Sequence, residues 1–210
     1  TFAAFVSIAV SRLFDRKDRF TYRLANLWGQ TIVNVNPQWK IKIIDDHYIK
    51  PNKGYVIVAN HTSLADIVCL FCLNKHFKWV AKSSLFKIPF FGWSMSLLKY
   101  ISLSRGQHGS IRDSFNESIE CLNKDVSVLI FPEGTRSRSG QLAEFKNGAF
   151  KLALATKKPI VPGVIRGTGA ALTKGNATIS ATAAGFLKVL SPIEVSDYGE
   201  DYERLKTKVW

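Results

Sequence analysis

Short apolar runs alternate along this chain with longer segments whose apolar residues recur at helical spacing. The short runs are rich in β-branched residues, which is typical of buried strands. We expect strands over 31–35, 40–44, 55–59, 77–81, 101–103, 126–131, 160–165 and 186–195. We expect helices over 63–73, 110–122, 148–156 and 202–209, and two short ones over 84–100. This alternation predicts an α/β fold, a single domain with a mixed, largely parallel sheet flanked by helices.

The first 30 residues have a different pattern and are predicted to form a membrane-associated segment, 1–30, before a globular domain, 31–210. Residues 1–10 are mostly apolar, but as a helix they reach only about 15 Å, half of a bilayer core of about 30 Å. Because the sequence lacks an initial Met, we expect it to be trimmed, leaving either a monotopic anchor or the end of a longer hydrophobic helix. Residues 15–28 mix basic with apolar residues, as interfacial helices do. The alternative is a solvated helix that packs its apolar side on the domain.

The composition indicates a packed protein that binds an anionic partner. Its 210 residues are 46% hydrophobic and 21% charged, which excludes a disordered chain. The net charge of +13 predicts an anionic membrane surface, an acidic protein or substrate, or nucleic acid as partner. Without an RNA-binding aromatic pattern or zinc-finger spacing, we expect no nucleic acid. Basic residues concentrate near the N-terminus, at Arg12, Arg16, Lys17, Arg19 and Arg23.

The three cysteines, Cys69, Cys72 and Cys121, form no metal-binding pattern, and we expect no metal site. Cys69 and Cys72 are spaced as C-x-x-C, but they lie in an apolar helical run. We therefore interpret them as buried thiols rather than redox or metal ligands.

Polar residues follow three of the expected strands directly. His61 follows the strand over 55–59, Arg105 follows 101–103, and the segment Glu133 to Arg136 follows 126–131. In open α/β sheets, sites lie off the carboxyl ends of the strands, so we expect these residues to converge.

His61 and Asp66 form a candidate general-base pair. In a regular helix, residues five apart do not face each other, but His61 in the preceding loop and Asp66 in the first turn can meet. Asp66 would then fix the imidazole tautomer, and the other ring nitrogen could take a proton from a hydroxyl. The alternative is equally supported by this motif alone: Asp66 completes a capping box with Ser63, and His61 is a loop residue.

The segment Glu133-Gly134-Thr135-Arg136 has the composition of a loop that receives an anion. Gly134 allows close backbone approach, Arg136 offers the donor geometry that matches phosphate, and Glu133 could accept from a polyol hydroxyl. The alternative is a surface turn with a salt bridge. Arg105 and Lys82 could add phosphate contacts, although each alone is typical of a surface charge.

Two common catalytic classes are disfavoured by the sequence. A nucleophilic hydrolase would carry a G-x-S-x-G elbow, and the stretch Gly92 to Ser96 lacks the second Gly. ATP-driven chemistry would require a G-x-x-x-x-G-K-[S/T] loop, which is absent from the sequence.

Four blocks in order resemble the glycerolipid acyltransferases, most closely the bacterial 1-acyl-sn-glycerol-3-phosphate acyltransferases. The blocks are NH-x4-D at His61 and Asp66, SR at Arg105, FPEGTRS at 131–137 and IVPGVI at 160–165. The resemblance covers about residues 40 to 195. Two positions depart from the family pattern: Lys82-Ser83-Ser84-Leu85 stands where K-x-E-L is common, and Ser104 stands where Asp is usual. Both departures leave the acceptor open.

The resemblance implies acyl transfer from acyl-ACP or acyl-CoA to the free hydroxyl of a lysophospholipid, giving phosphatidic acid in phospholipid biosynthesis. It implies His61 as base with Asp66 as its partner, no acyl-enzyme, and no cofactor beyond the acyl donor. The implied partners are a lysophospholipid, an acyl carrier protein or CoA thioester, and an anionic membrane, at the cytoplasmic face of the inner membrane. The implied acceptor and phosphate site comprises Lys82, Arg105, Glu133, Gly134, Thr135 and Arg136, and the acyl-donor region comprises Leu85, Phe86 and Pro162.

Two other interpretations stay open at this point. The same chemistry could act on glycerol-3-phosphate or another lysolipid, and the chain could instead be a non-catalytic basic peripheral lipid-binding module. The apolar run 85–98 could line the acyl site or be ordinary core.

Overall fold

The computed structural model describes residues 2–15, 18–137, 140–170 and 182–210. The α-helices are α1 Phe2–Arg12, α2 Arg19–Asn34, α3 Ala65–Phe71, α4 Phe91–Leu97, α5 His108–Asn123, α6 Gly148–Thr156 and α7 Tyr202–Val209. The strands are β1 Trp39–Ile44, β2 Val56–Ala59, β3 Phe77–Lys82, β4 Ile101–Leu103, β5 Ser127–Ile130, β6 Ile160–Arg166 and β7 Ala183–Val189. Two short 3₁₀ helices matter below, η2 Ser83–Lys87 and η3 Thr168–Ala170.

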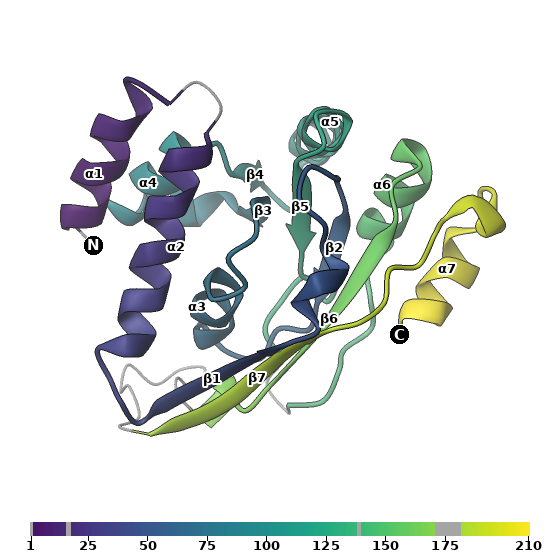
Figure 1. Cartoon of the computed structure of the whole chain (residues 1–210). Helices are drawn as coiled ribbons and strands as arrows, with labels where there is room; N and C mark the ends of the chain where they lie inside the picture. The colour runs from purple at the N-terminus through teal and green to yellow at the C-terminus, as the bar shows by residue number, and fades with distance from the viewer. Residues whose placement is uncertain (1, 16–17, 138–139, 171–181) are drawn as a thin grey trace.

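The seven described strands form one sheet in the order β1-β7-β6-β2-β5-β3-β4 (Figure 1). Neighbouring strands run parallel, except that β6 and β7 are antiparallel. The predicted α/β domain with a mixed, largely parallel sheet is therefore confirmed. The parallel strands β2, β3, β4 and β5 end at the same edge of the sheet, which is where the candidate site residues follow.

The two faces of the sheet carry separate hydrophobic cores because strand side chains alternate. On β2, Ile57 and Ala59 belong to the cluster that includes residues of α1 to α4. Val56 and Val58 belong to the cluster that includes residues of α5, α6 and α7. All four side chains are buried, so β2 lies at the centre of a three-layer structure, and the residues that follow it are held from both sides.

The N-terminal helices α1 and α2 pack against each other and against the sheet domain. Their connection is fixed by Asp18, whose carboxylate pairs with Arg12, with Lys78 on β3 and with Lys99. The Lys78 amine is buried, and this burial lowers its pKa although Asp18 opposes the shift. Arg16 and Lys17, counted among the basic residues of this region, lie outside the described residues.

Several large apolar side chains of this region stay exposed in spite of that packing. Phe2, Val6 and Val10 follow one another at four-residue spacing on α1. The exposed set continues over the turn after α1, over α2, and over α4 and the segment before it. Its other members are Leu13, Phe14, Phe20, Leu27, Ile88 and Trp93. Together these nine residues are called the apolar patch below. Within the described residues, the helices are all too short or too polar to cross a bilayer.

Three sequence-based element boundaries are corrected by the structure. Residues 31–34 continue α2 instead of forming a strand, since Val33 is buried against Trp39 and Ala65. The helix expected over 63–73 is shorter, Ala65–Phe71. The last strand lies earlier than 186–195, at Ala183–Val189. The division at residue 30 falls inside α2, and the two-segment organisation stays a prediction.

The C-x-x-C cysteines carry free thiols. Cys69 is buried in α3, and this burial raises the pKa of its thiol to about 12, with a smaller contribution from Cys72. Burial also raises the pKa of the half-buried Cys72 thiol. Both thiols are therefore poor nucleophiles at neutral pH.

Candidate active site

The His61 and Asp66 side chains meet at the carboxyl end of β2. His61 lies in the loop after the strand and Asp66 in the first turn of α3, and His61 Nδ1 lies 2.8 Å from Asp66 Oδ2. The imidazole ring stacks on Phe131, with ring centroids 4.0 Å apart and planes 9° apart. The imidazole is therefore held both at one nitrogen and across one face.

The Asp66 carboxylate is fully buried and accepts several hydrogen bonds. Oδ2 accepts from the main-chain N–H of Thr62 at 2.7 Å and of Ser63 at 2.8 Å, in addition to His61. Oδ1 accepts from the Thr168 hydroxyl. A carboxylate only accepts hydrogen bonds, so His61 Nδ1–H donates to Oδ2, and in the neutral imidazole Nε2 then carries the lone pair.

The contacts of the Asp66 side chain fit both interpretations of the His61 and Asp66 motif. Asp66 accepts from the Ser63 N–H, which is one half of a capping box, and it also pairs with His61. Helix capping and imidazole orientation reinforce each other here, because the same contacts that begin α3 fix the carboxylate.

The main chain of His61 is anchored by the loop after β5. Glu133 Oε1 accepts from the His61 N–H at 2.7 Å, and the His61 carbonyl accepts from the Ser137 N–H at 2.8 Å. Glu133 Oε2 accepts from the Ala143 N–H at 2.9 Å. The Glu133 carboxylate, expected to accept from a polyol hydroxyl, is 4% exposed, and both its oxygens accept from main-chain N–H groups.

A second anchor joins the ends of β2 and β6. The Asn60 side chain donates to the Ile165 carbonyl at 2.9 Å and accepts from the Ile165 N–H at 2.7 Å. This two-bond contact fixes the residue directly before His61. From the sequence, Asn60 was noted only as the first residue of the NH-x4-D block, and no role was predicted for it.

The candidate phosphate-binding residues gather at the same edge of the sheet. Gly134 adopts a positive φ of 75°, and a Cβ there would lie 3.7 Å from Arg105 Cζ, so the Arg105 guanidinium lies beside the loop. Lys82 ends β3 and is paired in register with Leu103, two residues before Arg105. Thr135 is exposed and Arg136 is half-buried in the same loop. Arg138 and Ser139, which continue the polar loop, lie outside the described residues.

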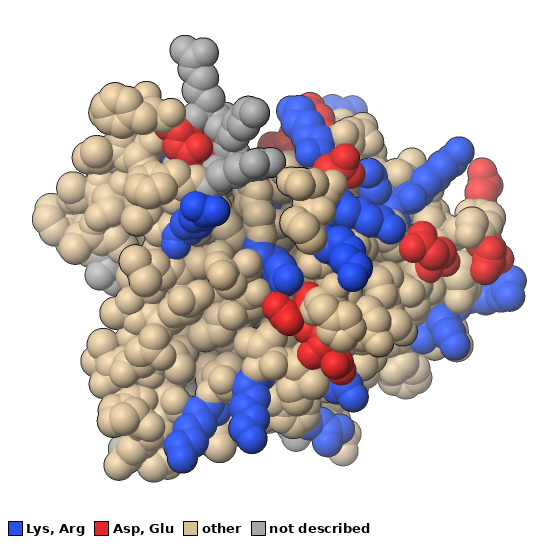
Figure 2. All heavy atoms as spheres, viewed as in Figure 1, with Lys and Arg blue, Asp and Glu red and all other residues tan. Residues whose placement is uncertain are grey.

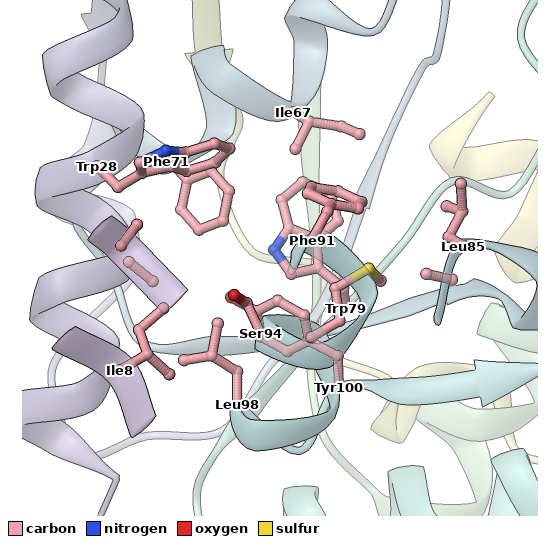
Figure 3. Close-up of a pocket in the computed structure, with 14 residues that line it drawn as sticks. Ile8, Trp28, Ile67, Phe71, Trp79, Leu85, Phe91, Ser94, Leu98 and Tyr100 are labelled. Carbon is pink, nitrogen blue, oxygen red and sulfur yellow. The ribbon is translucent and has the colours of Figure 1, made fainter. Parts of the chain in front are cut away.

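An apolar pocket lies between the N-terminal helices and the sheet (Figure 3). Its cavity volume is about 70 Å³, and all the space between its lining residues, open solvent included, is about 630 Å³. Phe131, which stacks on His61, has its ring centroid 5.7 Å from that of Trp79 in the pocket wall. The lining residues come from α1, α2, α3, β3, η2, α4 and the segment between α4 and β4, and include Ile8, Trp28, Phe71, Trp79, Leu85 and Tyr100.

The three residues expected in the acyl-donor region do not lie together. Leu85 lines the apolar pocket. Phe86 packs against the hydrophobic core cluster that includes residues of α1 to α4. Pro162 lies on β6 and lines a second, more polar pocket together with Asn60, Glu133 and Arg166. The apolar run 85–98 therefore contributes both pocket lining and ordinary core.

Comparisons with known proteins give the family of this chain. The model of the Acyltransferase family matches residues 40–166, which hold His61, Asp66, Arg105 and Arg136. The chain belongs to the Acyltransferase family. The resemblance carried by the four sequence blocks is thereby confirmed.

Individual members of the Acyltransferase family extend the comparison. The chloroplastic 1-acyl-sn-glycerol-3-phosphate acyltransferase LPAT1 of Arabidopsis thaliana is 37% identical over 166 residues, which are 78% of this chain and 46% of that protein. The 1-acyl-sn-glycerol-3-phosphate acyltransferase of Pseudomonas aeruginosa is 37% identical over 113 residues, 53% of this chain and 44% of that protein. This chain spans about half the length of the curated relatives it matches.

A solved structure shows the same fold. The crystal structure of the 1-acyl-sn-glycerophosphate (LPA) acyltransferase PlsC from Thermotoga maritima matches with a TM-score of 0.81 and 26% identity. The match covers 96% of this chain and 82% of that chain, so it includes the N-terminal helices as well as the Acyltransferase-family domain.

Sequence reasoning missed three residues of this Acyltransferase-family site. Phe131 was noted only as part of a block, although an aromatic residue directly after a strand that ends at the site was a usable signal. Asn60 gave a weaker signal, as the polar residue that ends a buried strand. Thr168 gave none, because nothing local ties it to Asp66.

Proposed function

We propose that this protein transfers a fatty acyl group from a thioester to the free hydroxyl of 1-acyl-sn-glycerol-3-phosphate, giving phosphatidic acid. The observation that carries the proposal is the His61–Asp66 pair, which lies at a strand end next to Arg105 and the Gly134 loop. The names of the relatives support the choice of acceptor. The acyl thioester of acyl carrier protein or of CoA is the one co-substrate of the proposed reaction, which uses no further cofactor and no metal.

The proposed reaction is a direct displacement without an acyl-enzyme. His61 Nε2 takes the proton of the acceptor hydroxyl while its oxygen attacks the thioester carbonyl carbon. The tetrahedral intermediate then collapses, the carbon–sulfur bond breaks, and the leaving thiolate takes the proton back from the imidazolium. Asp66 stabilises that imidazolium and holds the ring with Nε2 free.

Arg105, Arg136 and Lys82 are proposed to bind the acceptor phosphate. Arginine forks match phosphate oxygens in pairs, and Lys82 adds a point charge at the end of the neighbouring strand. Gly134 and Thr135 bring the main chain of the loop close to the same anion. In this proposal, Glu133 acts on His61 through the main chain rather than on the acceptor.

The apolar pocket is proposed to hold the acyl chain of the donor. Its wall reaches the imidazole through Trp79 and Phe131, so a chain in the pocket would end in a carbonyl near His61. Leu85 lines that pocket, and Phe86 supports it from the core. We assign Pro162 to the wall of the second pocket and propose no contact of it with the acyl chain.

The protein is proposed to act at an anionic membrane surface, at the cytoplasmic face of a bacterial inner membrane. Two-chain lipid products stay in a bilayer, so the active site must reach its interface. The apolar patch supports insertion of α1 and α2 into that interface. The net charge of +13 would attract anionic lipid and also an acidic acyl carrier protein.

The test of this function is the variant His61→Ala in the presence of acceptor and labelled acyl donor. We expect transfer to fall by about 10²- to 10⁴-fold, which is the usual contribution of a general base. Binding of the protein to vesicles should be unchanged. The exposed His47→Ala is the matched control and should transfer at the wild-type rate. Retained turnover in His61→Ala would refute the mechanism.

A panel of acceptors separates the related functions. Wild-type protein is assayed with 1-acyl-sn-glycerol-3-phosphate, glycerol-3-phosphate and other lysolipids, each with acyl-ACP and with acyl-CoA. Preference for another acceptor would keep the chemistry and change the substrate. Vesicle binding without transfer to any acceptor would favour a lipid-binding module.

A further inference from the structure

The Asp66 carboxylate has a partner that lies outside the four sequence blocks. Oδ1 accepts from the hydroxyl of Thr168, which lies 102 positions further along the chain, in η3 after β6. We propose that Thr168 is a positioning residue for acyl transfer: its hydroxyl fixes the Asp66 carboxylate, and Asp66 in turn fixes His61. This inference rests on the proposed function of the His61 site.

The two oxygens of Asp66 are held in different ways. Oδ2 accepts from His61 and from two N–H groups of the same loop, so its partners are local in sequence. In the described part of the chain, the hydrogen bond to Oδ1 comes from Thr168. Thr168, which is distant in sequence, therefore orients the carboxylate through Oδ1. Its hydrogen bond opposes rotation of the Asp66 carboxylate about the Cβ–Cγ bond.

Burial makes the hydrogen bond from Thr168 important. Thr168 is 2% exposed and Asp66 is fully buried, so water cannot readily replace the hydroxyl as a donor. A buried carboxylate oxygen without a donor is unfavourable, and the carboxylate would turn towards other donors. Any such turn moves Oδ2 away from Nδ1 and with it the imidazole.

The backbone before Thr168 is shaped to deliver this hydroxyl. Gly167 adopts a positive φ of 85°, and a Cβ there would lie 2.0 Å from the Ala184 carbonyl oxygen, so the turn packs directly on β7. A Cβ added at Gly185 would lie 3.4 Å from the Thr168 methyl carbon. Because β7 supports the turn, Thr168 lies in a fixed position rather than on a free loop.

The test uses Thr168→Val, which keeps the shape of the side chain and removes the hydroxyl, and Thr168→Ser, which restores it. We expect Thr168→Val to lower kcat about 10- to 100-fold, as for loss of a hydrogen bond to a charged group, with both KM values unchanged. Thr168→Ser should recover most of the lost kcat. Thr156→Val is the matched control, because its partly buried hydroxyl bonds to the Leu152 carbonyl on the other face of the sheet.

A spectroscopic readout tests the same contact without substrate. The proton on His61 Nδ1, assigned by its loss in His61→Ala, should give a downfield NMR signal in wild type and in Thr168→Ser. In Thr168→Val, that signal should shift or broaden. This readout decides the inference even if wild-type protein transfers no acyl group, an outcome that would reject the proposed function alone.

Two outcomes would overturn the role of Thr168. One is an unchanged kcat together with an unchanged Nδ1 proton signal in Thr168→Val. The other is a lower melting temperature with normal kcat measured well below it, which would make the contact purely structural.

Discussion

At the scale of residues, His61 is held both by its ring and by its main chain. The Glu133 carboxylate offers two acceptor oxygens to two N–H groups, one on His61 and one on Ala143. A carboxylate suits this site because it only accepts hydrogen bonds. Any replacement that presents a donor there would oppose one of the two N–H groups.

The variant Glu133→Gln tests this argument. Its amide NH₂ would face an N–H group, so we expect a loss of about 1–3 kcal/mol in the free energy of unfolding, together with slower acyl transfer. Urea unfolding and an initial-rate assay measure the two effects. The exposed Glu144→Gln is the control and should change neither. A fully stable Glu133→Gln with a raised KM for the acceptor would instead favour direct contact with the acceptor.

At this scale, contacts between residues close together in the sequence could be predicted, and contacts between residues far apart could not. The His61–Asp66 pair could be proposed because both residues lie within six positions around the start of a helix. The capping and catalytic interpretations could not be separated, because both use the same carboxylate. Thr168 could not be predicted, since only the folded sheet brings it to Asp66.

At the scale of elements, the helix α2 shows where local preference is overridden. Thr31, Ile32 and Val33 are β-branched and favour a strand, yet they form the last turn of a helix. Packing contacts favour the helix over a strand here, because Val33 is buried and Gly29 lets α2 approach α3 closely. The strands that precede the site were predicted well, because buried β-branched runs carry an unambiguous signal.

The close approach of α2 and α3 predicts the effect of Gly29→Ala. The added Cβ would lie 2.4 Å from the Cβ of Phe71, so the helices must move apart. We expect a loss of about 1–3 kcal/mol in the free energy of unfolding, as for overpacked cores. In Gly109→Ala on α5, the new methyl meets open space, and this control should be neutral or slightly more stable. Equal melting temperatures for the two variants would contradict the packing argument.

At the scale of the whole molecule, the side shown in Figure 2 carries both charged and apolar surface. In the view of Figure 2, many Lys and Arg side chains lie over α5, α6 and α7 with Asp and Glu among them, and fewer charged side chains of the described residues lie over α1 and α2. The apolar side is proposed to contact lipid and the basic side to attract acidic partners.

The double variant Leu13→Glu/Phe14→Glu tests the lipid contact. These side chains are 76% and 82% exposed, so the change should leave the fold intact. Loss of two large apolar groups, each worth about 1.5–3 kcal/mol when buried, should weaken vesicle binding by well over tenfold. Co-sedimentation with anionic vesicles measures this. Ile111→Glu on α5 is the control, and equal binding of both proteins would reject α1–α2 as the lipid-binding side.

The pairing of β1 with β7 determines when β1 can join the sheet during synthesis. Among the described strands, β1 has β7 as its sheet neighbour, and Trp39 pairs with a residue 144 positions later, Ala183. During synthesis, β1 therefore leaves the ribosome long before its partner exists and presents an open strand edge in the meantime. The edge can be closed only after β7 has been synthesised. Ribosome-bound chains arrested before residue 183 should thus be protease-sensitive around β1 and engage chaperones, and chains arrested well beyond residue 189 should be protected there.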